Sequence, residues 1–266
     1  MAEEKILEIN DLCMYFGGVH AVDGLTFSVG EKEIFGLIGP NGAGKTTVFN
    51  CITQFYKPTS GTIYYKGRNG EKILLNKEKV HDMVKLGIVR TFQNVEVIRE
   101  LSVLDNLLIA GHTLYKTPMA GQFLHVPSLK REEKEMRERA LKVLEFMELT
   151  EYKDRYCFGL PYGILKKIEI ARTLMCDPKL IILDEPAAGL NDTETAELAA
   201  LINRISESYD CSILLVEHDM GLVMEVCDRI CAISFGKLLA IGTPDEIQND
   251  EGVRTAYLGN RKRAEG

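Results

Sequence analysis

The sequence has no long apolar run and no excess of positive charge, and these two absences exclude broad classes of protein. Its apolar stretches, such as residues 180–183 and 213–216, are far shorter than the roughly 20 residues of a transmembrane helix. Lys and Arg number 32 against 39 Asp and Glu, a net charge of −7, so the chain is not expected to act mainly by neutralising nucleic-acid phosphates. The first residues also lack the basic and apolar regions of a secretory signal. We therefore expect a cytoplasmic protein that does not itself cross the membrane.

Neither the cysteines nor the prolines indicate a specialised class of protein. The seven cysteines are odd in number and scattered through mostly apolar segments, which is typical of buried side chains in a reducing compartment. Cys227 and Cys231 have helical spacing, but no histidine or second cysteine pair lies near them, so a zinc site is not expected. With 8 prolines, 45% hydrophobic and 27% charged residues, the composition is that of an ordinary α/β protein.

The pattern of apolar residues indicates mostly strands in the first third of the chain, mostly helices in the middle, and alternating strands and helices in the last third. Strands are expected at residues 6–9, 25–29, 33–39 and 61–65, and helices dominate from about residue 102, including an amphipathic one at 130–148. The last third alternates strand 180–183, helix 193–206, strand 212–216, helix 220–226 and strands from 230. This alternation predicts a mainly parallel sheet covered by helices.

A phosphate-binding pattern follows the strand at 33–39. Residues 39–46, GPNGAGKT, match G-x4-G-K-[ST] between an apolar strand and a segment able to start a helix. The glycines let backbone N–H groups turn inward around a phosphate, and the helix N-terminus adds a positive dipole. Lys45 can reach the β- and γ-phosphate oxygens, and Thr46 can hold Mg²⁺. The residues expected to bind nucleotide here are Gly39, Asn41, Gly42, Ala43, Gly44, Lys45, Thr46 and Thr47.

Polar side chains follow three further apolar strands. Asp184 and Glu185 come directly after the strand at 180–183, and a buried parallel strand delivers its carboxyl end to the ligand crevice. We expect Asp184 to bind Mg²⁺ and Glu185 to polarise the water that attacks the γ-phosphate. His218, after the strand at 212–216, can donate a hydrogen bond to that phosphate or hold the water. Gln93 follows another short strand and can bind Mg²⁺ or water through its amide.

The order and separation of these motifs resemble those of the ATP-binding cassette (ABC) ATPases over nearly the whole chain. Between the phosphate loop and the acidic strand, this family places a glutamine loop, here Gln93, and a helical subdomain that ends in a second motif, here residues 159–174. The resemblance implies a P-loop NTPase of the ABC-ATPase fold, with a mainly parallel sheet, an antiparallel β subdomain and an inserted helical subdomain. It divides the chain into a nucleotide-binding core at 1–93 and 166–266 and a helical subdomain at 94–165.

The second motif departs from the LSGGQ pattern of the family. Pro161 replaces the usual Ser, Tyr162 a Gly and Ile164 a Gln, so Gly163 is the clear match. In the family this loop closes on the γ-phosphate held by the opposite subunit. The resemblance therefore implies a head-to-tail dimer around ATP, with Gly163 as a contact in trans.

Other roles also follow from the resemblance. The family stacks an aromatic residue from the first strand region on adenine, which implies Phe16, with Tyr15 as the second candidate. The catalytic residues implied are Lys45, Gln93, Glu185 and His218, and the Mg²⁺ ligands are Thr46, Gln93 and Asp184. ATP and Mg²⁺ are the expected cofactors.

Several segments narrow the resemblance further. They are PAAGLN at 186–191, VEHDM at 216–220, the insertion AGHTLYK at 110–116 with the helical segment at 130–145, and AYLG at 256–259. Together they are similar to the larger of the two ATPase subunits of branched-chain amino-acid importers. This implies permease subunits, a second ATPase subunit or a second copy of this chain, an extracytoplasmic binding protein, and a peripheral location on the cytoplasmic face of the membrane. The alternatives are the same role for urea, other amides or lipopolysaccharide, or a non-transport ABC ATPase acting on DNA or ribosomes.

The segment at 94–117 is the expected permease-facing surface, because it follows Gln93 and can pass the nucleotide state outward. The apolar residues expected to supply its contacts are Val97, Ile98, Leu101, Val103 and Leu104.

Overall fold

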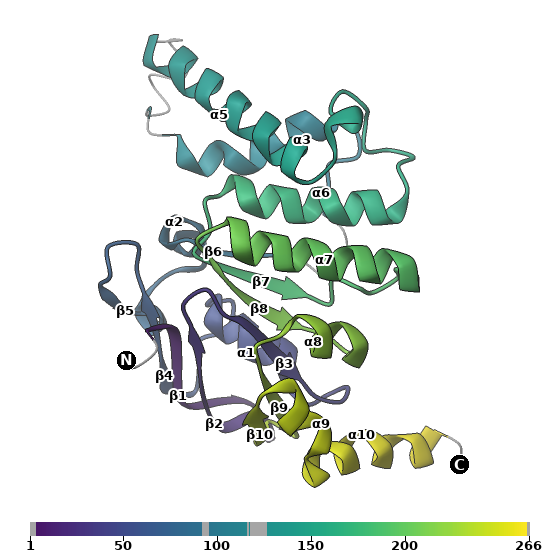
Figure 1. The fold of residues 1–266 in the computed structure, drawn as a ribbon. Coiled ribbons are helices and arrows are strands. Elements are labelled where there is room, and N and C mark those ends of the chain that lie inside the picture. Colours follow the sequence, from purple (N-terminus) through teal and green to yellow (C-terminus); the bar gives the residue numbers. More distant parts are fainter. Residues whose placement is uncertain (1–3, 92–95, 116, 118–126, 265–266) are drawn as a thin grey trace. The chain divides into compact units, whose positions relative to one another are not determined.

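The computed structural model describes residues 4–91, 96–115, 117 and 127–264, which form two compact units (Figure 1). The first comprises Met1–Ile88 with Lys179–Gly266, and the second comprises Val89–Pro178. The boundaries that the sequence suggests for the helical subdomain, 94 and 165, stay a prediction. Each unit is described by itself below.

The larger sheet has six strands in the order β10-β9-β3-β8-β7-β6. Their bounds are β3 Ile34–Ile38, β6 Ile88–Arg90, β7 Leu180–Asp184, β8 Ser212–Val216, β9 Arg229–Ser234 and β10 Lys237–Gly242. Strand β3 pairs in parallel with β8 and with β9, and β7 pairs in parallel with β8, whereas β10 is antiparallel to β9. Strands β3, β7 and β8 are buried along their whole length, as expected of strands covered on both faces. The predicted mainly parallel α/β architecture is confirmed.

The two faces of this sheet are covered by different helices because side chains alternate along β3. Phe35 and Leu37 belong to one hydrophobic core with Val48 and Phe49 of α1, Lys45–Ile52. On the other face, a Cβ added at Gly36 would lie 3.5 Å from Val223 Cγ1 in α8, Met220–Val226. Helix α7, Asp192–Ser208, connects β7 to β8 and begins with a capping box between Asn191 and Glu194.

The smaller sheet is antiparallel, with the order β2-β1-β4-β5. Its strands are β1 Lys5–Phe16, β2 Val19–Gly30, β4 Ser60–Lys66 and β5 Lys72–Leu74. The strands at 6–9 and 25–29 that the sequence indicates are only parts of β1 and β2. Register shifts interrupt the β1–β2 pairing, for example between Ile9 and Leu12, and each shift breaks the alternation of apolar and polar residues by which a strand is recognised.

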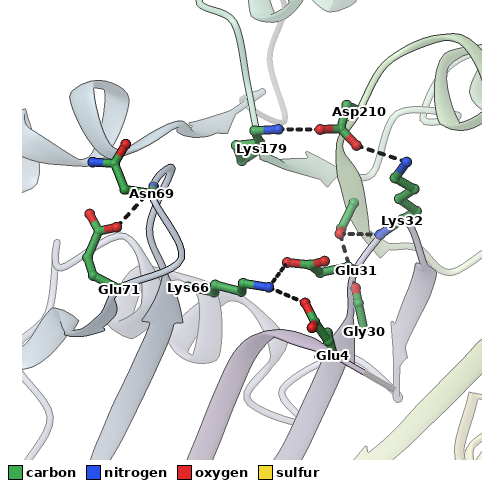
Figure 2. Close-up of polar contacts among 10 residues, drawn as sticks. Glu4, Gly30, Glu31, Lys32, Lys66, Asn69, Glu71, Lys179 and Asp210 are labelled. Carbon is green, nitrogen blue, oxygen red and sulfur yellow. Dashed lines mark hydrogen bonds and ion pairs between the residues drawn. The ribbon is translucent and has the colours of Figure 1, made fainter. Parts of the chain in front are cut away.

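Ion pairs gather near the amino-terminal ends of β3, β7 and β8 (Figure 2). They join Lys66 to Glu4 and Glu31, and Asp210 to Lys32 and Lys179. Ser212 adds two hydrogen bonds: its hydroxyl donates to the carbonyl of Gly30 at 3.0 Å and accepts from the N–H of Lys32 at 2.9 Å. Because every paired side chain is accessible to solvent, with exposed fractions from 29% to 69%, each pair contributes only about 0–1 kcal/mol. The buried core holds the two sheets of this unit together.

The remaining helices of the first unit are α2 Met83–Leu86, α9 Pro244–Asn249 and α10 Glu251–Ala264. The second unit consists mainly of α3 Val103–Ala110, α5 Pro127–Phe146 and α6 Tyr162–Met175, which contact one another. Short 3₁₀ turns lie at Leu75–Lys77, Val80–Asp82, Gly111–Leu114 and Thr150–Tyr152. No helix within the described ranges is both long and apolar enough to cross a bilayer.

The segment expected to face the permease is only partly exposed. Val103 and Leu104 are 0% and 4% exposed, because they form the inner face of α3 in the helical unit. The prediction that they contact a permease is therefore wrong. Ile98, in contrast, is 40% exposed and is available for such a contact.

Candidate nucleotide site

The predicted phosphate loop connects β3 to α1, and its glycines are required by the local backbone. Gly42 and Gly44 have φ angles of 80° and 106°, and Gly44 is the N-cap of α1. A Cβ at Gly44 would lie 2.4 Å from the carbonyl oxygen of Ala21, and one at Gly39 would lie 2.3 Å from that of Ile233. Only glycine fits these conformations and close approaches, so the sequence pattern is explained by packing within this unit.

Lys45, the first residue of α1, is buried and reaches across the loop. Its Nζ donates hydrogen bonds to the carbonyl oxygens of Gly39 at 2.7 Å and Pro40 at 3.3 Å. Burial lowers the pKa of Lys45, and the carboxylates of Glu185, Asp184 and Glu217 partly offset this effect. The ammonium group is thus held inside the curve of the loop, the position from which it can bind phosphate oxygens.

Glu185 and His218 are brought together from the ends of two neighbouring strands. Glu185 has a φ of 47°, in the left-handed region that non-glycine residues rarely adopt, and its N–H donates to the carbonyl of Val216 at 2.8 Å. His218 Nε2 lies 2.7 Å from Glu185 Oε1. The sequence predicts that both residues face the γ-phosphate, and in this structure they contact each other.

Most of the predicted nucleotide-binding residues line one hollow of about 370 Å³. These are Asn41, Gly42, Ala43, Gly44, Lys45, Thr46, Thr47, Glu185 and His218. Four further residues that the motifs did not indicate complete its lining: Val19, His20, Ala21 and Phe235. Gly39 and Asp184 are not part of the lining, although Asp184 ends β7 immediately before Glu185.

The aromatic residues expected to stack on adenine do not line this hollow. Phe16 is 44% exposed, and its ring meets that of Tyr56 edge-on with the centroids 5.2 Å apart. Tyr15 stacks on His20 with centroids 4.0 Å apart, and its hydroxyl donates to Asp23 Oδ1 at 3.0 Å. Hydrogen bonds to Cys13 and Asp23 raise the pKa of Tyr15. A role for Phe16 or Tyr15 in base binding stays a prediction.

Two predicted site residues lie outside the first unit or outside the described residues. Gly163 is in the first turn of α6, in the helical unit, and is half-buried. Gln93 falls within residues 92–95, which the structure does not describe. Their roles therefore stay predictions.

Glu217 is a functional candidate that the motifs did not reveal. Its side chain is 3% exposed. One carboxylate oxygen accepts from the N–H of Ala187 at 2.7 Å, and the other accepts from the N–H groups of His218 at 2.8 Å and Asp219 at 3.3 Å. Glu217 therefore ties the chain after β7 to the chain after β8, and so positions Glu185 and His218 relative to each other. The signal in the sequence that could have revealed Glu217 is an acidic residue directly after the fully buried strand β8.

Replacing Glu217 with glutamine is expected to loosen the Glu185–His218 pair. Glutamine replaces one carboxylate oxygen with an NH₂ group, which cannot accept a hydrogen bond from the backbone N–H groups around it. A buried donor left without an acceptor costs about 1–3 kcal/mol. ATP turnover should fall about tenfold or more while nucleotide binding changes little, since Glu217 does not line the hollow. Steady-state hydrolysis and nucleotide titration measure the two effects, with the exposed Glu225→Gln on α8 as control. Unchanged turnover in Glu217→Gln would show that Glu217 does not position the pair.

A phosphate loop after β3, an Asp-Glu pair at the end of β7 and a histidine after β8, all on one mainly parallel sheet, define a P-loop nucleotide hydrolase. The chain belongs to the ABC transporter family, because the sequence model of the family described as "ABC transporter" matches residues 22–188. A second description, "Branched-chain amino acid ATP-binding cassette transporter", matches residues 237–262.

Two transport ATP-binding proteins are similar in sequence to this chain over 96% of its length. The high-affinity branched-chain amino acid transport ATP-binding protein LivG of Salmonella typhimurium is 45% identical over 256 residues, which are 96% of this chain and 98% of LivG. BraF of Pseudomonas aeruginosa, with the same description, is 44% identical over 96% of this chain and 98% of its own length.

Solved structures agree with the fold. The ADP conformation of MJ1267, an ATP-binding cassette of an ABC transporter, is 32% identical with a TM-score of 0.81, and the match covers 96% of this chain and 99% of that one. A nucleotide-free ATP-binding cassette from an ABC transporter is 33% identical with a TM-score of 0.78, covering 95% and 98%. The predicted ABC-ATPase fold is confirmed.

Proposed function

We propose that this chain is the ATP-binding and ATP-hydrolysing subunit of an importer for branched-chain amino acids. The observation that carries the ATPase role is that the phosphate loop, Glu185 and His218 line a single hollow. The cargo assignment is supported by the C-terminal match at 237–262 and by LivG and BraF. The ATPase role for another cargo remains the alternative.

The phosphate loop and Lys45 bind the triphosphate. The first N–H groups of α1, which begins at Lys45 after the N-cap Gly44, have no partner within the helix and can donate to the phosphates. The helix dipole favours the negative charge of the phosphates. Lys45 exchanges its hydrogen bonds to Gly39 and Pro40 for phosphate oxygens. Thr46, which is exposed in the hollow, and Asp184, at the end of β7, offer the hard oxygen donors that fit Mg²⁺. When bound, Mg²⁺ neutralises charge on the phosphates.

Glu185 acts as the general base in hydrolysis. It polarises a water for attack on the γ-phosphate, and the contact with His218 at 2.7 Å fixes the direction of its carboxylate. When the phosphate enters, His218 can donate to a γ-phosphate oxygen and release Glu185 to the water. Gln93 is assigned to the same phosphate and Mg²⁺ environment from its motif.

A second ATPase subunit completes the site in trans. Helix α6 begins at Tyr162 after the N-cap Pro161, and the first N–H groups of a helix have no partners within it. We assign Gly163 and its neighbours in this turn to the γ-phosphate bound by the opposite subunit. The partner is either a sister subunit or a second copy of this chain.

The permease is assigned to an exposed apolar patch of the helical unit, formed by Ile98, Tyr156 and Phe158. These residues are 40%, 65% and 76% exposed. Their two segments are joined by hydrogen bonds from Cys157 N–H to Leu101 O and from Phe158 N–H to Arg99 O. An exposed apolar patch of this kind fits a protein partner. This contact would place the chain on the cytoplasmic face of the membrane.

Co-purification from detergent-solubilised membranes tests this assignment. The tagged chain should bring down a pair of integral membrane proteins, and the recovered complex should hydrolyse ATP. Phe158→Asn should weaken that recovery several-fold, whereas Leu239→Asn, an exposed change in the other unit, should not. Recovery of ribosomes or DNA without membrane proteins would overturn the transport role.

A further inference from the structure

A bulky aromatic residue occupies an unfavourable backbone position beside the nucleotide hollow. Phe235 and Gly236 form the turn between β9 and β10, with φ angles of 48° and 76°. Two residues with positive φ are typical of the hairpin turn that strongly prefers Asn-Gly, and a large aromatic residue at the first of them is a genuine outlier. The Phe235 side chain is 83% exposed, so packing within this chain does not account for its presence there.

The turn is nevertheless fixed to the phosphate loop. The N–H of Gly236 donates to the carbonyl of Ala43 at 2.9 Å, and the carbonyl of Gly236 accepts from the N–H of Asp23 at 2.9 Å. A Cβ at Gly236 would lie 2.7 Å from the carbonyl oxygen of Ala21. Phe235 is therefore held at a constant place relative to the loop that binds the phosphates.

The sheet order shows on which side of the phosphates Phe235 lies. The phosphate loop follows β3, Glu185 and His218 follow β7 and β8 on one side of β3, and Phe235 follows β9 on the other side. A nucleotide whose γ-phosphate is next to Glu185 and His218 must extend its sugar and base away from them. Phe235 lines the hollow together with Val19 and His20, which lie in β2 beside the loop.

We propose that Phe235 is a positioning residue for ATP that packs against the sugar-and-base end of the bound nucleotide. The proposal rests on the assignment of the hollow as the ATP site. An aromatic ring offers a face for a purine without hydrogen-bond readout, so the contact strengthens nucleotide binding with little discrimination between bases. It also gives the hollow an aromatic wall other than Phe16 and Tyr15, which do not line it.

Nucleotide titration of the purified chain tests this proposal. Phe235→Asn should weaken binding of ATP and GTP by similar factors of about 5- to 150-fold, the range for loss of one base–aromatic contact. Binding of tripolyphosphate with Mg²⁺, which has no sugar or base, should be unchanged. Phe235→Tyr should bind ATP like the unmodified chain. Phe55→Asn, which alters another exposed aromatic residue that does not line the hollow, should have no effect.

A thermal melt without nucleotide separates this role from a structural one. Asparagine suits the positive φ of the turn, so Phe235→Asn should raise Tm by about 2 °C although it binds ATP less well. Equal affinity for ATP in Phe235→Asn and the unmodified chain, or an equal loss for tripolyphosphate, would overturn the proposal. Absence of ATP binding by the unmodified chain would overturn both this proposal and the ATPase assignment.

Discussion

Glu185→Gln should bind ATP with nearly unchanged affinity and hydrolyse it about 10²- to 10⁴-fold more slowly, the usual contribution of a positioned general base. The substitution keeps the size of the side chain and removes its ability to take a proton. It also retains an oxygen that can stay near His218 Nε2, 2.7 Å from Glu185 Oε1 in this structure. Binding should survive because, in the proposed function, the phosphate loop and Lys45 supply most contacts to the triphosphate.

Single-turnover hydrolysis and equilibrium binding should be measured on the same preparation. Glu225→Gln makes the same chemical change on the exposed side of α8 and should hydrolyse ATP at the normal rate. If Glu185→Gln turned over ATP at the unmodified rate, another group would have to be the base. If it lost ATP binding, Glu185 would hold the nucleotide rather than activate water.

Lys45→Met should lower ATP turnover by about 10²- to 10³-fold or more, the cost of removing one preorganised charged donor. Methionine keeps much of the length of the buried stem, so the change isolates the loss of the ammonium group. That group also donates to the carbonyls of Gly39 and Pro40 without nucleotide, so the variant should bind ATP more weakly. Lys85→Ala, an exposed lysine paired with Asp82, is the control.

A melting curve shows whether Lys45→Met lowers ATP turnover by removing a catalytic group or by destabilising the fold. Two carbonyl partners are lost, and each net hydrogen bond from a charged donor contributes about 1.5–3 kcal/mol. The substitution also removes the desolvation cost of the buried ammonium group, which is the cause of the lowered pKa of Lys45. Tm should therefore fall only slightly. A chain that melts normally and still hydrolyses ATP at the original rate would contradict the role of Lys45.

The phosphate loop, the acidic strand and the strand before His218 were predictable because each combines a local pattern with a clear period. The loop needs glycines at positions where the Ala21 and Ile233 carbonyls approach within 2.4 Å of an added Cβ, and this requirement is visible as a sequence motif. Strands β7 and β8 are entirely buried, so they appear as unbroken apolar runs. The mainly parallel sheet followed from their alternation with helices.

Other features depend on tertiary contacts that leave little trace in the sequence. Glu217 is identical in type to many solvated acids, and only its three backbone donors from two loops identify its role. Val103 and Leu104 would be apolar in a permease contact as well as in a core, so the sequence does not distinguish the two. The packing of α3 buries both side chains in the core of the helical unit. Phe235 resembles an ordinary exposed residue until its positive φ and its place in the hollow are known.

ATP-driven uptake of labelled leucine into proteoliposomes tests the central claim most directly. This chain would be reconstituted with the permease, second ATPase subunit and binding protein that the proposed function requires, and uptake of leucine and urea would be compared. The account predicts leucine uptake that requires ATP, falls sharply with Glu185→Gln and does not extend to urea. ATP hydrolysis without leucine uptake, or leucine uptake that is unaffected by Glu185→Gln, would contradict it.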